Sequence, residues 1–85
     1  TIVQAQSEVE AAEAAKGNGV LAVVHEDDYT DEGEGWNLLV ATEDVIDEIK
    51  SRFAARRPLF RQTGEGLIVL SVLGSEPEIM AALAS

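Results

Sequence analysis

Two apolar runs constrain the fold of this chain more than any other feature. Val20–Val24 contains only apolar side chains, and Leu67–Leu73 is interrupted only by Ser71. Because neither run alternates with polar residues, each indicates a strand inside a sheet, buried on both faces. Both runs are far shorter than the ~20 residues that a membrane-spanning helix needs. We therefore expect interior strands and no segment that crosses a membrane.

The segment Thr42–Arg57 has the spacing of an amphipathic helix. Ile46, Ile49 and Phe53 recur at intervals of three and four residues, which places them on one face. Carboxylates occupy the start of the segment and arginines occupy its end, where the helix dipole stabilises each sign of charge. Pro58 cannot continue a helix, so the helix is expected to stop before it.

Two further helices are indicated by capping boxes. Ser7 precedes Glu10 by three residues, and Ser75 precedes Glu78 by the same interval. In this arrangement the serine hydroxyl accepts a hydrogen bond from the glutamate N–H while the carboxylate reaches back. The first helix is expected to end at Gly17, a typical C-terminal stop.

The remaining segments complete the expected order. Strands are indicated at Trp36–Ala41 and at Leu59–Gln62, the latter forming a hairpin with Leu67–Leu73. Residues 1–6 either extend the first helix or form a short strand. The order α-β-β-α-β-β-α favours an α/β or α+β fold, in which a small mixed sheet of about three to four strands is covered by about two to three helices. We expect a single compact domain over residues 1–85.

One parallel unit is expected within this order. Strand Trp36–Ala41, helix Thr42–Arg57 and strand Leu67–Leu73 have the lengths of a right-handed βαβ crossover. The two strands would then run parallel within the sheet.

Charge is divided unevenly along the chain. The net charge is −10, from 16 carboxylates and six basic residues, and five of those basic residues lie in Lys50–Arg61. Nucleic acid is an improbable partner, because its binding depends on neutralising phosphates with Lys and Arg. A basic protein or protein complex is the expected partner. No cysteine is present, which favours a cytoplasmic location.

Glu26–Gly35 is the most acidic segment and ends beside the only tryptophan. We predict that it is a solvated loop that docks on a basic groove, with carboxylates in the place that phosphates would take. The protein would then be an inhibitor or adaptor that mimics nucleic acid. The predicted partner-binding residues are Glu26, Asp27, Asp28, Asp31, Glu32, Glu34 and Trp36.

A second interface is predicted at the arginines. Guanidinium groups suit carboxylate-rich surfaces, on another molecule or on a second copy of this chain. The predicted residues are Arg52, Arg56, Arg57 and Arg61. Under this alternative the chain is a structural subunit of a homo-oligomer or of a larger complex.

Catalysis, cofactors and a resident metal are not expected. His25 is the only histidine and has no nucleophile in a recognisable pairing with it. Taking Asp28 as the first position of a calcium loop places Leu39 at the twelfth, where a glutamate is required, so the EF-hand pattern fails. Weak association of divalent cations with the acidic loop is a second alternative.

Overall fold

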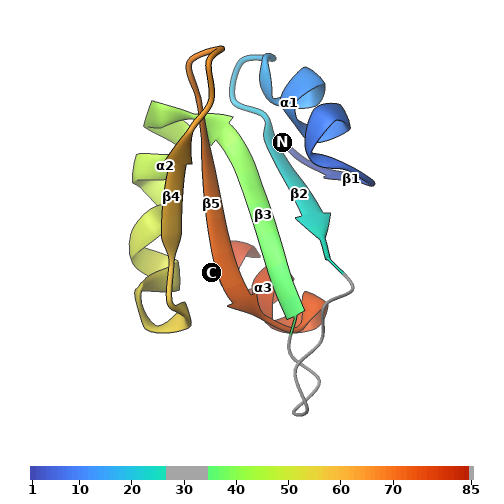
Figure 1. Cartoon of the computed structure of the whole chain (residues 1–85). Coiled ribbons are helices and arrows are strands. Elements are labelled where there is room, and N and C mark those ends of the chain that lie inside the picture. The colour runs from blue at the N-terminus through green and yellow to red at the C-terminus, as the bar shows by residue number, and fades with distance from the viewer. Residues whose placement is uncertain (27–34, 85) are drawn as a thin grey trace.

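The computed structural model describes residues 1–26 and 35–84 (Figure 1). Its elements are β1 (Ile2–Ala5), α1 (Glu8–Ala15), β2 (Leu21–His25), β3 (Gly35–Thr42), α2 (Glu43–Ile49), the 3₁₀ helix η1 (Lys50–Arg56), β4 (Leu59–Gln62), β5 (Leu67–Gly74) and α3 (Glu76–Ala84). The predicted acids Asp27, Asp28, Asp31, Glu32 and Glu34 lie outside the described residues.

The strands form one mixed sheet in the order β1-β2-β3-β5-β4. β1 runs parallel to β2, and every other neighbouring pair is antiparallel. The prediction of a small fold in which a mixed sheet is covered by helices is confirmed. The strand number was underestimated, because the described residues form a five-stranded sheet in which residues 2–5 add a parallel edge strand.

The predicted βαβ unit is wrong in its second strand. β3 pairs with β5 antiparallel, with Trp36 opposite Leu73 and Thr42 opposite Leu67. The reason is the hairpin: α2 and η1 return the chain to β4, which runs parallel to β3, and the hairpin then reverses direction so that β5 inserts between them. The unit β1-α1-β2 has the crossover order instead.

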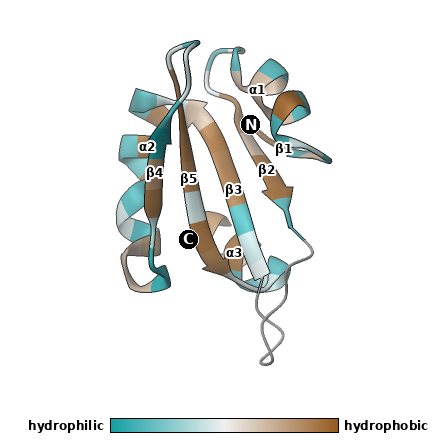
Figure 2. Cartoon of the chain, viewed as in Figure 1, coloured by the Kyte–Doolittle hydropathy of each residue, from teal (hydrophilic) through white to brown (hydrophobic). Residues whose placement is uncertain are grey.

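Helices cover both faces of the sheet. On one face, α2, η1 and α3 bury Ile46, Phe53 and Ile79 against the inner strands. On the other face, α1 contributes Ala11 and Ala15, whose small side chains let the helix approach β2 and β3 closely. Figure 2 colours most of the inner strands as hydrophobic and much of α2 as hydrophilic. The expectation that Val20–Val24 is buried on both faces is confirmed for Leu21 to Val24.

The predicted helix over residues 42–57 is present as two consecutive pieces. Its apolar stripe is buried as expected, with Ile46, Ile49 and Phe53 all in the core. The α-helix tightens into η1 after Ile49, and Arg57 adopts a left-handed conformation with φ of 54° before Pro58 ends the segment.

Both predicted serine caps form, but only the second is a complete capping box. The Ser7 hydroxyl accepts from the Glu10 N–H at 3.2 Å, although the Glu10 carboxylate accepts from the Gln6 N–H rather than from Ser7. At α3 the exchange is reciprocal: Ser75 Oγ accepts from the Glu78 N–H and Glu78 Oε1 accepts from the Ser75 N–H, both at 3.4 Å. Among the described residues, no helix is long and apolar enough to cross a membrane.

Candidate functional site

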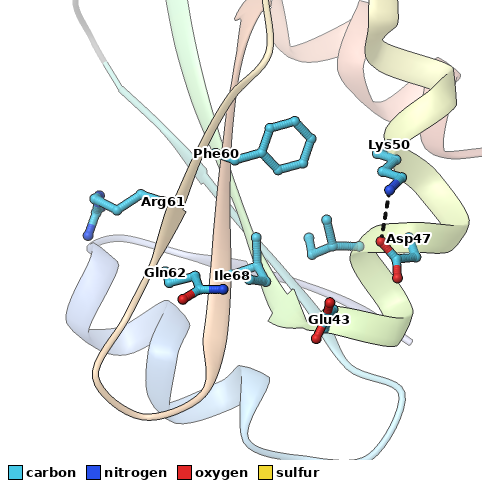
Figure 3. A pocket seen from close by; sticks show the side chains of 8 residues that line it. Glu43, Asp47, Lys50, Phe60, Arg61, Gln62 and Ile68 are labelled. Atoms are coloured by element: carbon cyan, nitrogen blue, oxygen red, sulfur yellow. Dashed lines mark ion pairs between the residues drawn. The ribbon is translucent and has the colours of Figure 1, made fainter.

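A concave surface lies between α2 and β4. It encloses about 220 Å³. Figure 3 shows Phe60 projecting from β4 toward α2, with Glu43, Asp47 and Lys50 on the helix across from it. Ile68 of β5 contributes apolar surface between the two elements. We call this surface the α2–β4 groove; the residues that line it are Glu43, Ile46, Asp47, Lys50, Phe60, Arg61, Gln62 and Ile68.

Phe60 is exposed because of where its strand lies in the sheet. It pairs with Leu70, which belongs to the core cluster on the α2 side, so Phe60 faces that side as well. β4 is an edge strand of the sheet, and within the described residues no strand lies beyond it. Phe60 therefore keeps 55% of its surface exposed, although residues of its type are usually buried.

Carboxylates dominate the outer side of α2. Glu43, Asp44, Asp47 and Glu48 are all exposed. Asp47 forms an ion pair with Lys50 at 3.0 Å. Within the described residues, the other three carboxylates have no hydrogen-bond or ion-pair partner. Glu43 and Asp44 lie in the first turn of α2, where the positive end of the helix dipole stabilises their charge.

Of the sequence-predicted docking residues, the structure describes Glu26 and Trp36, and neither lines this groove. Glu26 is half-buried, and its N–H donates to the carbonyl oxygen of Trp36 at 2.9 Å. Trp36 is also half-buried and lies opposite Leu73 on the sheet face that α1 occupies, away from the groove. β3 begins at Gly35 and ends directly before α2, so Trp36 lies near the end of the strand that is farther from α2.

Three of the four predicted second-interface arginines have partners within the chain. Arg52 donates to the Leu83 carbonyl at 3.0 Å, which satisfies the C-terminal end of α3. Arg56 pairs with Glu78 at 2.9 Å, and Arg61 pairs with Glu8 at the start of α1. Arg57 is exposed. Of the four arginines predicted to form a second interface, only Arg57 has no partner among the described residues.

Two ion pairs shift the pKa of a group at the surface. The hydrogen bond from Arg56, helped by Ser75, lowers the pKa of Glu78 below its ordinary value. The hydrogen bond to Glu65, together with the charge of Glu13, raises the pKa of Lys16 above its ordinary value. The Arg56–Glu78 and Lys16–Glu65 pairs each connect two different parts of the fold, so these charged side chains have a structural role.

His25 belongs to a hydrogen-bond network at the end of β2. Its Nδ1 donates to Oδ1 of Asn37, a polar residue that is only 2% exposed. The Asn37 amide donates to the Gly74 carbonyl at 2.9 Å, which fixes its orientation and identifies Nδ1 as the protonated nitrogen. His25 Nε2 lies 3.5 Å from Glu76. Across the parts of the chain that the structure describes, no three potential ligands lie close enough to hold a metal ion.

Sequence reasoning missed Phe60 and Asn37. Phe60 was considered only as part of a basic stretch, because nothing local shows that Leu59–Gln62 is an edge strand. Asn37 carried a signal, since it is a polar residue within an apolar strand and such residues need buried hydrogen-bond partners. Comparison of the chain with protein-family models, with curated proteins and with solved structures gave no match.

Proposed function

We propose that this protein is a small binding module that docks a basic partner protein through its acidic surface, without catalysis and without a cofactor. The observation that supports this most strongly is the outer side of α2. Three of its four exposed carboxylates have no cation beside them among the described residues, and the helix borders a groove with an exposed aromatic ring. The uncompensated carboxylates would attract a basic partner, and the exposed aromatic ring would give that partner an apolar surface to bury.

The acidic segment Asp27–Glu34 remains part of the proposal on the grounds of its sequence. It adds five carboxylates to those of α2. An inhibitor or adaptor that used both regions would present more negative charge to a basic partner than α2 alone. The proposed setting is cytoplasmic, in keeping with the absence of cysteine.

Self-association is the second candidate, and the exposed side chains of β4 favour it. Leu59 and Phe60 are 61% and 55% exposed, and a second copy could cover them. The charge opposes this candidate, because two copies would bring a total of −20 together, twice the −10 of one chain. The arginines that would offset this repulsion are mostly engaged within their own chain.

Two variants that remove equal charge test the proposal. One replaces Asp27, Asp28, Asp31 and Glu32 by amides, and the other replaces Glu43, Asp44, Asp47 and Glu48. Each changes the net charge from −10 to −6, since four carboxylates become neutral. Binding to cytochrome c, a folded basic protein, is measured by calorimetry at about 0.1 M and about 1 M salt, between which the screening length falls from about 10 Å to about 3 Å.

The α2 variant should bind at least about tenfold more weakly than the parent at low salt, which corresponds to about 1.4 kcal/mol. The loss of affinity in the loop variant measures how much the acidic segment Asp27–Glu34 contributes to binding. Circular dichroism checks that both variants keep the fold. Binding that is absent in the parent, or that is equally strong in both variants and at both salt concentrations, would contradict the proposal.

A further inference from the structure

The outer edge of β4 offers main-chain hydrogen-bonding groups. β4 is the last strand of the sheet and pairs only with β5. The Thr63 N–H donates to the Leu67 carbonyl at 2.9 Å, which sets the phase of the hairpin ladder. Because hydrogen-bonded and non-hydrogen-bonded pairs alternate along an antiparallel ladder, the N–H and C=O groups of Phe60 and Gln62 face away from β5.

The same two residues direct their side chains into the α2–β4 groove. Phe60 lies opposite Leu70 and Gln62 lies opposite Ile68, and all four face the α2 side of the sheet. Figure 3 shows Phe60 and Ile68 on this side, whereas Arg61 projects away from it. A strand that paired with the edge of β4 would therefore place every second side chain over the groove.

We propose that β4 binds an extended basic segment of a partner protein, which joins the sheet beside β4 and places lysine or arginine side chains at alternate positions in the α2–β4 groove. This inference rests on the proposed function and specifies its partner. Addition of a strand to an exposed sheet edge is a common mode of peptide recognition, in which main-chain bonds give affinity and side-chain pockets give specificity.

Charge and spacing favour a basic segment. Neighbouring groove-facing side chains of an added strand lie about 7 Å apart, at two residues of about 3.3 Å each. Glu43 and Asp47 are one helical turn apart on α2, a rise of about 6 Å, and α2 runs alongside β4 in Figure 1. Two cationic groups at alternate positions can thus meet Glu43, which has no ion-pair partner among the described residues, and Asp47, which would exchange its pair with Lys50. The aliphatic stems of lysine or arginine would cover the Phe60 ring.

A second copy of the chain fits this edge less well. Two β4 strands paired with each other would bring both acidic α2 helices to one side of the joined sheet. Few cations near this edge are free to offset that charge, because Arg61 pairs with Glu8 and Lys50 already pairs with Asp47. The occupant that the charge selects is a basic segment, and self-pairing is one outcome of the test below.

The test uses the full chain and two synthetic probes. The lysine probe is the capped heptapeptide Thr-Lys-Thr-Lys-Thr-Lys-Thr, and the control probe carries glutamate in place of lysine. Residue-resolved amide exchange should show rapid exchange at Phe60 and Gln62 in the free protein and at least tenfold slower exchange with saturating lysine probe. The amides of the intervening residues, which bond to β5, should be slow in both states. The glutamate probe should not bind.

A matched pair of double variants tests the groove. Glu43→Gln with Asp47→Asn removes the two carboxylates that line it, and Asp44→Asn with Glu48→Gln removes the same charge from the other side of the same helix. The first pair should weaken binding of the lysine probe at least tenfold, and the second should weaken it less than threefold.

The outcomes separate this inference from the proposed function. Equal losses in the two double variants, or exchange protection away from β4, would overturn the inference and leave the proposed function standing. If the protein binds cytochrome c but not the lysine probe, the inference is likewise overturned and the proposed function still stands. Amides of Phe60 and Gln62 that are already protected in a free dimer would assign the edge to a second copy. Failure to bind either basic probe would overturn the proposed function itself.

Discussion

Phe60→Ser should weaken binding of the lysine probe without unfolding the protein. Phe60 is 55% exposed in the free chain. A large aromatic side chain buries about 150–250 Å² when fully covered, so a partner has about 80–140 Å² of this ring left to cover. At about 25 cal/mol per Å², this area is worth about 2–3.5 kcal/mol.

Binding retains only part of that free energy, because the partner and the side chains at the interface lose freedom. We expect a loss of about 1.4 kcal/mol, which is about tenfold in the dissociation constant. The effect on the free energy of unfolding should be about 1 kcal/mol or less, since the ring is largely exposed already. Calorimetry measures the affinity. Urea unfolding followed by Trp36 fluorescence measures stability.

Leu59→Ser is the matched control for this prediction. Leu59 is the neighbouring residue of β4, is 61% exposed, and lies opposite Ser71 on the other face of the sheet. Its replacement should change the affinity less than threefold. Equal losses in the two variants, or no loss with Phe60→Ser, would refute the assignment of the groove as the contact surface.

Three further predictions concern the stability of the scaffold. Phe53→Ala should lower the free energy of unfolding by about 3–5 kcal/mol, because the ring is fully buried. That is a large part of the about 4–13 kcal/mol expected for a chain of this size, and a loss below about 1 kcal/mol in urea unfolding would contradict the packing described. Ser75→Ala should lower it by about 1 kcal/mol by removing the cap of α3, and an unchanged urea midpoint would contradict the cap. The lowered pKa of Glu78 means that its stabilising effect is present above the ordinary pKa of about 4.5 and is lost as the pH falls through the lower folded value. Arg56→Gln should therefore reduce the urea midpoint at pH 6, and the difference from the parent should shrink toward pH 3; a constant difference would contradict the pair.

Local patterns predicted the helices better than the sheet. The buried stripe of Ile46, Ile49 and Phe53 and both serine caps depend on residues within a few positions of each other, and all are present. The direction of β5 depends on a hairpin reversal and on insertion between two other strands, which no local spacing encodes. The prediction of a parallel β5 was wrong for this reason.

The sequence predicted the charge of the partner but not the groove that we propose as its binding site. An acidic chain was expected to bind a basic partner, and that expectation remains a proposal. The groove itself depends on β4 being an edge strand, because the same Phe60 side chain on an interior strand would be buried. In the sequence, Glu43 and Asp47 were explained by the helix dipole, and their place beside Phe60 becomes visible only when α2 packs along the sheet.

The account depends most on where a basic partner touches the protein. Two-dimensional amide spectra of the isotope-labelled full chain, recorded during titration with the lysine probe, measure this directly. We predict that the resonances of α2 and β4 shift together, that they follow a single binding curve, and that the shifts diminish as salt is raised. Shifts confined to α1 and β1, or no shifts on α2 at saturating probe, would contradict the claim that the acidic side of α2 docks a basic partner.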